Sequence, residues 1–307
     1  MIKRSGSVQR RYGIGEWYGR SFADLSPEKR KSLAKSLGSK ARGASSRKCP
    51  FRSNFKCNKK GGVCTLRLYE RDDQQRVVVP AHDDSGLLRT VCPNRFHEDE
   101  RIFKWVGETV LNAPDPSMVG EVGFLESEIR VAGEHAKADD VGRIDCVLVL
   151  PDSKPLGWCA LELQAVYFSG KGMDSDFKQL RAGKGTGIPF PTALRRPDYR
   201  SSGPKRLMPQ LQIKVPTLRR WGKKMAVVVD RAFYNHMGQM ALAKDISNSD
   251  IAWFVVKYEK SGDGFSLARD AVYYTTLEEA VGGLTGGSAV TQAEFESRIL
   301  KKLSRSA

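Results

Sequence analysis

The chain has 307 residues, of which 40% are hydrophobic and 28% are charged. This composition excludes wholesale disorder and collagen-like repeats, because it supplies enough apolar side chains for a sizeable core. No apolar run approaches the length of about 18 residues that a bilayer crossing needs, and no apolar signal stretch follows the first methionine. We therefore expect a cytoplasmic protein with one large domain or two smaller ones and no membrane partner.

The charge balance points to a polyanionic partner. Lysine and arginine total 51 against 35 aspartates and glutamates, a formal net charge of +16, and they are densest over 1–60 and 171–224. A membrane-surface protein would concentrate such charge on an amphipathic helix, whereas here it runs through the whole chain. The charge could also serve only to keep the protein in solution. We expect nucleic acid, bound through its phosphates and therefore in a salt-sensitive way.

The first 45 residues are basic and rich in glycine and serine, and they contain one predicted helix. Ser26 is its N-cap, Pro27 takes the first helical position, and Gly38 ends it. Further along the chain, residues 170–204 form a long basic stretch rich in glycine and proline. A stretch of that kind inside a domain predicts a functional loop.

Apolar patterning predicts the remaining elements in chain order. Strands are predicted over 63–70, 76–80, 122–131, 143–150, 158–166, 225–230 and 251–258. Helices are predicted over 99–112 and 207–221, the second interrupted near Pro209 or Pro216. Two short helices close the chain, the last with a capping box at Thr291 and Glu294. The fold class is therefore α/β (α+β), with a central mixed sheet flanked by helices.

The six cysteines divide by their surroundings. Cys146 and Cys159 lie inside apolar runs and are expected to be small core residues. The other four, in a segment rich in charge and glycine, are Cys49, Cys57, Cys64 and Cys92. Their spacing is not the paired C-x-x-C of zinc ribbons. It leaves two interpretations open, a tetrahedral zinc or iron site and four unrelated thiols.

Two carboxylates stand out on neighbouring predicted strands. If Leu150 pairs with Gly157 in an antiparallel hairpin, Asp145 lies opposite Glu162. Side chains alternate along a strand, so Glu162 and Gln164 share one face. Two facing carboxylates repel each other unless a proton or a cation lies between them, and Mg²⁺ prefers oxygen ligands.

These residues fit the PD-(D/E)XK pattern of metal-dependent nucleases, with Gln164 in the usual lysine position. Glu128 is a third candidate carboxylate on a nearby predicted strand. The alternative is that all of these are ordinary polar residues of half-buried strands.

The motifs together resemble the NotI family of type II restriction endonucleases, over about 48–259. The matching motifs are Cys49-Pro50-Phe51, Cys57, Gly62-Val63-Cys64, Cys92-Pro93-Asn94-Arg95, Ile144-Asp145, Leu161-Glu162-Leu163-Gln164, Tyr167-Phe168-x-Gly170 and Ala252-Trp253-Phe254-Val255. This resemblance implies a PD-(D/E)XK nuclease core with a small added four-cysteine domain. On that basis we divide the chain into a basic N-terminal extension (1–47), a four-cysteine segment (48–98) and an endonuclease core (99–307) whose loop 170–206 contacts DNA.

The resemblance also implies a function and its residues. Asp145, Glu162 and Gln164 take the catalytic positions, with Asp145 and Glu162 binding a catalytic Mg²⁺, and Glu128 is the least secure match. A structural iron, for which zinc could substitute, would be held by Cys49, Cys57, Cys64 and Cys92. The implied enzyme is a homodimer that cuts double-stranded DNA at a GC-rich palindrome and leaves 5′-phosphate and 3′-hydroxyl ends. A DNA methyltransferase is the expected functional partner in restriction-modification.

Two other functions remain open at this point. A non-catalytic four-cysteine DNA-binding protein would bind DNA without Mg²⁺-dependent cutting. A repair nuclease with the same core would cut structured or damaged DNA without a fixed site.

Overall fold

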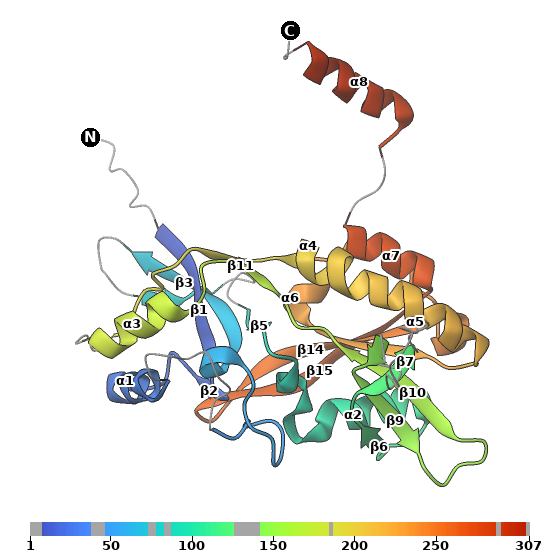
Figure 1. The fold of residues 1–307 in the computed structure, drawn as a ribbon, viewed down its shortest axis with the longest axis horizontal. Coiled ribbons are helices and arrows are strands. Elements are labelled where there is room, and N and C mark those ends of the chain that lie inside the picture. The colour runs from blue at the N-terminus through green and yellow to red at the C-terminus, as the bar shows by residue number, and fades with distance from the viewer. Residues whose placement is uncertain are drawn as a thin grey trace, which may run out of the picture.

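The computed structural model describes residues 8–37, 47–72, 78–82, 87–125, 142–183, 187–286 and 290–304. Its largest sheet has eleven strands: β1 (Val8–Trp17), β2 (Arg20–Ser21), β3 (Val63–Asp72), β4 (Val78–Pro80), β5 (Arg89–Thr90), β6 (Ser117–Val119), β9 (Cys146–Leu150), β10 (Gly157–Leu163), β13 (Met225–Asp230), β14 (Ile251–Ser261) and β15 (Gly264–Thr275). They follow the order β4-β3-β1-β2-β15-β14-β13-β10-β9-β6, with β5 paired to β3 (Figure 1). The predicted mixed α and β architecture with a large mixed sheet is confirmed.

Within the described ranges, the structure also contains eight α-helices and two short ribbons. The helices are α1 (Pro27–Ser36), α2 (Arg101–Val106), α3 (Asp174–Ala182), α4 (Tyr199–Ser202), α5 (Met208–Arg220), α6 (Arg231–Tyr234), α7 (Leu277–Thr285) and α8 (Gln292–Leu303). Helix α8 stands apart from the sheet (Figure 1). The ribbons pair β7 (Val122–Leu125) with β8 (Gly142–Ile144), and β11 (Phe168–Gly170) with β12 (Arg195–Pro197). A short helical turn at 93–100 precedes α2 after a break at Asp99 and Glu100, and a π-helical turn at 107–111 extends it, so the helix predicted over 99–112 is confirmed over 101–111.

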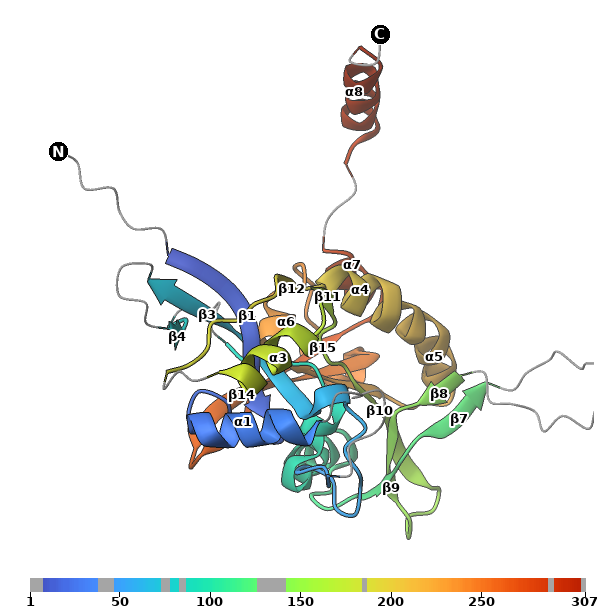
Figure 2. The same cartoon turned by 60° about the vertical axis from the view of Figure 1, so that its left-hand side comes forward.

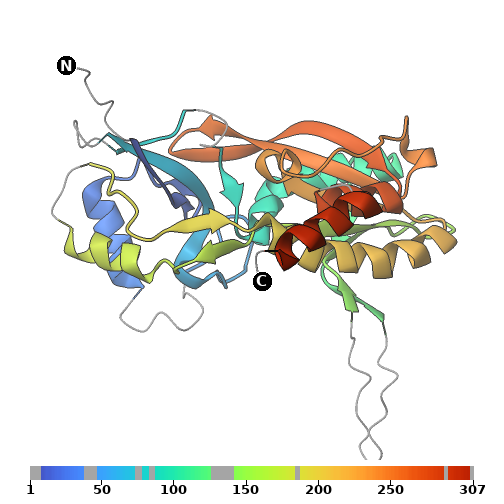
Figure 3. The same cartoon turned by 90° about the horizontal axis from the view of Figure 1, so that it is seen from above.

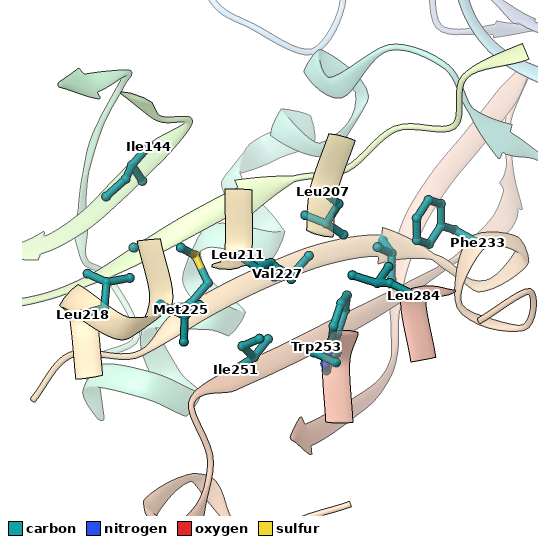
Figure 4. Packing of buried hydrophobic residues seen from close by; sticks show 14 of the residues in the cluster. Ile144, Leu207, Leu211, Leu218, Met225, Val227, Phe233, Ile251, Trp253 and Leu284 are labelled. Carbon is teal, nitrogen blue, oxygen red and sulfur yellow. The ribbon is translucent and has the colours of Figure 1, made fainter. Parts of the chain in front are cut away.

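The centre of the sheet is apolar on both faces. β13 runs parallel to both β10 and β14, and every residue of β13 is buried. One face packs against α5, α6 and α7, where Leu211 and Leu218 lie over Met225 and Trp253 (Figure 4). The other face packs against α2. Helices on both faces explain why these strands are continuous apolar runs, as is usual for parallel strands.

The N-terminal strands form the other half of the sheet. β1 pairs along its whole length with β3, and the two halves meet where Arg20 of β2 pairs with Gly264 of β15. Helices α1 and α3 pack together at this end of the molecule, far from α5 (Figures 2 and 3). β1 was not predicted. It lies within the predicted N-terminal extension (1–47) and pairs with β3 of the predicted cysteine segment. The boundaries drawn at 47 and 98 stay a prediction.

Several local predictions are confirmed. Ser26 caps α1 by accepting a hydrogen bond from the Lys29 backbone N–H, and Pro27 begins the helix. The Thr291 capping box of α8 is formed. The β9–β10 hairpin has the predicted register, with Leu150 opposite Gly157.

Two predictions about 170–221 are wrong. The stretch 170–204 is not one loop, because it contains α3, β12 and α4. Phe177 and Leu180 of α3 pack into the core of the N-terminal half, a signal hidden by the surrounding glycines and prolines. Helix α5 runs without a break from Met208 to Arg220, and Pro209 lies at its start, directly after a π-helical turn at 203–207. Pro216 stays inside the helix, whose apolar face is held against the sheet.

Candidate active site

Asp145 and Glu162 meet at the end of the β9–β10 hairpin. The strand pairing runs from Leu150 and Gly157 to Cys146 and Leu161, one position short of the predicted pair. Asp145 is the break between β8 and β9, and its Oδ2 accepts a hydrogen bond from the Leu163 backbone N–H at 3.0 Å. The side chain of Asp145 thus takes the place of the next backbone hydrogen bond between the two strands. This bond holds Asp145 beside Glu162.

Glu162 is a buried carboxylate, with 2% of the residue exposed. The pKa of Glu162 is raised to about 7, chiefly by burial and also by the nearby Asp145. Lys214 opposes both effects, because its Nζ lies 2.6 Å from Glu162 Oε1. Burial also raises the pKa of Asp145, against the Leu163 N–H and Lys214. Two carboxylates with raised pKa values at one point make a site that favours a cation.

Gln164 lies directly after the end of β10, two residues beyond Glu162. Leu161 and Leu163 point into the opposite core, as predicted from strand alternation. The backbone N–H of Gln164 donates to Val228 O at 3.0 Å, which extends the contact between β10 and β13. Asp145, Glu162 and Gln164 line one cavity of about 550 Å³. Glu128, the third predicted carboxylate, lies outside the described residues.

The charged group that the sequence analysis missed at this site is Lys214. It lies on the buried face of α5, between Leu211 and Leu218, and pairs with Glu162 across the gap between helix and sheet. Its Nζ also lies 3.1 Å from Gln210 Oε1. The available signal was a lysine on the apolar face of an amphipathic helix, where a charge needs a partner.

The cavity has a basic rim. Lys59, Lys171 and Arg206 line it, and the Arg206 guanidinium lies 4.7 Å from the centre of the Tyr167 ring. A cavity that holds two acidic side chains under basic residues suits a phosphodiester of a nucleic acid.

The family assignment follows from a comparison of the whole chain. The family model described as restriction endonuclease NotI matches residues 31–267, which include the hairpin carboxylates and all four cysteines of the N-terminal half. The chain belongs to the NotI restriction endonuclease family. It is therefore a type II site-specific deoxyribonuclease, and DNA is its substrate. No curated protein matches the chain. None of the helices in the described ranges combines the length and apolar character needed to cross a bilayer.

In this NotI-family enzyme, the arginines of the basic stretch expected to contact DNA fall into two groups, one buried and one exposed. Arg195 is buried and turned inward, where it pairs with Asp176 and donates to Tyr12 O at 2.9 Å and Lys171 O at 3.0 Å. It fastens β12 to α3 and β1, so it is a structural residue. A second cavity, of about 790 Å³, is lined by Arg196 and Arg200 on the other side of the β11–β12 ribbon. Unlike Arg195, both of these arginines are exposed.

The four cysteines of the N-terminal half lie near one another. All four are buried and free of disulfides. Cys64 lies on β3 and Cys92 shortly follows β5, and the Val91 N–H donates to Cys64 O at 3.0 Å. Cys57 and Cys92 each have a pKa raised by burial and raised further by Cys49.

Lys59 lies among these thiols and donates to Val91 O. Burial lowers the pKa of Lys59, whereas Cys92, Cys64 and Cys57 raise it. As arranged in the described ranges, no three His, Cys, Asp or Glu side chains are close enough to hold a metal ion. The donor chemistry is nevertheless that of a tetrathiolate site, with an ammonium group that would favour thiolates.

The cysteine segment borders the active site. Lys59, Pro93, Asp145 and Leu163 line both the carboxylate cavity and a neighbouring cavity of about 630 Å³ that also includes Cys92. Ordering of the cysteine segment therefore bears directly on the wall of the carboxylate cavity.

Proposed function

We propose that this enzyme makes Mg²⁺-dependent double-strand cuts in DNA at a GC-rich palindromic site and leaves 5′-phosphate and 3′-hydroxyl ends. The observation that carries this proposal is the pair Asp145 and Glu162, a half-buried and a buried carboxylate that line one cavity with a basic rim. We assign the strands β9, β10, β13 and β14, with helices on both faces, to a PD-(D/E)XK core with Gln164 in the lysine position.

Asp145 and Glu162 fit a divalent cation, because carboxylate oxygens are the ligands that Mg²⁺ prefers. When bound, Mg²⁺ would supply an activated water and stabilise charge on the reacting phosphate. The Leu163 N–H holds the Asp145 carboxylate in place. Gln164 both donates and accepts hydrogen bonds, so we assign it to orienting the attacking water. Glu128 remains the proposed third carboxylate.

The basic rim would bind the substrate. Arg206 and Lys171 are exposed and line the cavity of the carboxylates, and the exposed Arg196 lines the second cavity, so their charges can neutralise DNA phosphates. Arginine in this position can also read guanine through O6 and N7, which suits a GC-rich site. A palindromic site matches a two-fold homodimer with one active site for each strand. A DNA methyltransferase would protect the host DNA of such a cytoplasmic enzyme.

We propose that Cys49, Cys57, Cys64 and Cys92 hold a structural iron, with zinc as the alternative metal. The thiols lie within electrostatic reach of one another, and four sulfur ligands suit either metal. A metal there would order a segment rich in charge and glycine that borders the active site. The segment would form the small four-cysteine domain of the proposed architecture.

Digestion of a large GC-rich DNA with Mg²⁺ or with EDTA, followed by end sequencing, tests this function. We expect discrete fragments with Mg²⁺ only, all ending at one palindrome with a 5′-phosphate. A smear would indicate a structure-directed repair nuclease instead. DNA binding in a gel shift without any cutting would indicate a non-catalytic binding protein.

A further inference from the structure

The proposed Glu-x-Gln motif leaves the active-site strand without a cation. Glu162 lies on β10 and Gln164 directly follows it, and the neutral glutamine amide cannot offset the charge of the buried Glu162 and the half-buried Asp145. The group that does so comes from another element, because Lys214 of α5 donates to Glu162 Oε1 at 2.6 Å. We infer that Lys214 is a positioning residue of the nuclease reaction, which holds Glu162 ready for the cation and supplies from α5 the charge that the motif lacks. This inference rests on the proposed Mg²⁺-dependent function.

The contact is part of the site and is shielded from water. The side chains of Lys214 and Glu162 are 5% and 3% exposed. Lys214 lies behind Glu162, while Glu162 itself faces the cavity. It therefore acts on the reaction through Glu162 and does not touch the DNA.

The ammonium group of Lys214 has a second hydrogen-bond acceptor. Gln210 is one turn before Lys214 on α5, and its Oε1 lies 3.1 Å from Lys214 Nζ. Gln210 lines the cavity with Glu162. When Glu162 binds a cation, Lys214 can keep Gln210 as its hydrogen-bond partner. The pair thus lets Glu162 change partners without leaving a buried ammonium unsatisfied, which would be costly.

An ordinary structural ion pair is the competing explanation. Buried ion pairs add little stability compared with well-packed apolar residues, so stability alone gives weak reason for a lysine inside this apolar face. Lys214 Nζ lies 2.6 Å from Glu162 Oε1 and 3.1 Å from Gln210 Oε1, and both of these side chains line the cavity. A buried cation whose two partners both face the cavity is the arrangement that distinguishes a positioning role.

Variants at Lys214 separate the two explanations. Lys214→Met keeps the length of the side chain and removes its charge, and Lys214→Arg keeps the charge. Lys257→Met is the matched control, because Lys257 also pairs with a glutamate, Glu259, at 3.0 Å but lies exposed on β14. The substrate is a duplex that carries the palindrome found by end sequencing. The measurements are the single-turnover cleavage rate, the Mg²⁺ concentration for half-maximal rate, DNA affinity in EDTA, and thermal unfolding.

We expect Lys214→Met to lower the cleavage rate or raise the Mg²⁺ requirement by about 10- to 100-fold, as for the loss of a group that supports a metal ligand. DNA affinity in EDTA should stay unchanged, Lys214→Arg should recover part of the loss, and Lys257→Met should behave as the wild type. Wild-type rate and Mg²⁺ dependence in folded Lys214→Met would overturn the inference. A rate loss that only follows the loss of folded protein, with no rescue by arginine, would overturn it as well.

Gln210→Leu decides the matter if Lys214→Met does not fold. Gln210 is only partly buried, so its replacement should leave the fold intact. We expect it to raise the Mg²⁺ requirement, because Lys214 would then have no second acceptor. Unchanged Mg²⁺ dependence would overturn the inference. Failure of the wild-type protein to cut with Mg²⁺ would contradict the proposed function. Normal cutting by both the wild type and the variants would contradict only the inference about Lys214.

Discussion

The carboxylate of Asp145 accepts a hydrogen bond from the backbone N–H of Leu163 at 3.0 Å, next to Glu162. This bond joins the end of β9 to β10 through a side chain, at the point where the backbone ladder stops. The two acidic side chains are therefore held together by the hairpin itself. Their closeness is a source of electrostatic repulsion that a cation would relieve.

The first prediction concerns the pH dependence of stability without metal. The pKa of Glu162 is raised to about 7 by burial, so between about pH 5 and pH 7 the folded chain holds a proton that the unfolded chain releases. This contribution to stability is complete at low pH and is lost as the pH rises through 7. We expect the stability of the wild type, relative to Glu162→Gln, to fall by about 1 kcal/mol per pH unit in this window.

Urea unfolding of both proteins in EDTA at several pH values measures that difference. His97, whose pKa burial lowers to about 4, acts in the opposite direction but equally in both proteins. A constant difference between the two proteins from pH 5 to pH 7 would show that Glu162 titrates as an ordinary carboxylate.

The second prediction concerns the cysteines. Cys57→Ser should remove the structural metal and lower the melting temperature, because one of four sulfur ligands is lost. Cys159→Ala is the control, since Cys159 is buried in the apolar core below α2. We expect the control to keep about one metal ion per chain, as one tetrathiolate site requires. Metal content measured by inductively coupled plasma mass spectrometry gives the answer, and equal metal in both variants would exclude a cysteine site.

The third prediction concerns a buried arginine of the Cys-Pro-Asn-Arg motif. Arg95 has no exposed surface, and it pairs with Glu16 of β1 at 3.0 Å and donates to Phe265 O of β15 at 2.8 Å. It thereby joins the two halves of the sheet. Arg95→Met would leave Glu16 buried without its partner, at a cost of about 3 kcal/mol in the free energy of unfolding.

Chemical denaturation compares Arg95→Met with Arg101→Met, whose arginine is half exposed and pairs with Asp99 on the surface. The control should change stability by less than about 0.5 kcal/mol. Equal effects of the two substitutions would mean that Arg95 does not link the halves.

The fourth prediction concerns DNA affinity. Arg206 is exposed at the rim of the carboxylate cavity, so Arg206→Ala should weaken binding and reduce the slope of log affinity against log salt by about one. Fluorescence anisotropy with a labelled duplex at several salt concentrations measures the slope. Arg101→Ala, outside the cavity, should leave it unchanged. A normal slope for Arg206→Ala would remove Arg206 from the DNA interface.

The sequence predicted the hairpin and its carboxylates because these depend on local rules. The turn length and the alternation of side chains fix the register that brings Asp145 beside Glu162. The apolar runs of β13 and β14 were equally clear in the sequence, since strands buried on both faces consist mostly of apolar residues. The N-cap at Ser26 needed only its neighbouring residues.

The contacts between distant segments were not predictable in this way. Lys214 and Glu162 are separated by 52 positions, and their pairing depends on how α5 crosses the sheet. β1 has a half-exposed, polar sequence whose strand character comes from pairing with β3. Arg195 has the sequence surroundings of a DNA-binding loop, yet its partners on α3 and β1 turn it inward.

Cleavage by wild type and Asp145→Asn on the same GC-rich DNA, across a Mg²⁺ titration, tests the central claim most directly. Asp152→Asn, in the exposed turn of the same hairpin, is the matched control. We expect the wild type and the control to cut only with Mg²⁺, and Asp145→Asn to bind DNA normally but lose at least about 100-fold in rate at every Mg²⁺ concentration. Normal cutting by Asp145→Asn, or undiminished cutting by the wild type in EDTA, would contradict the account.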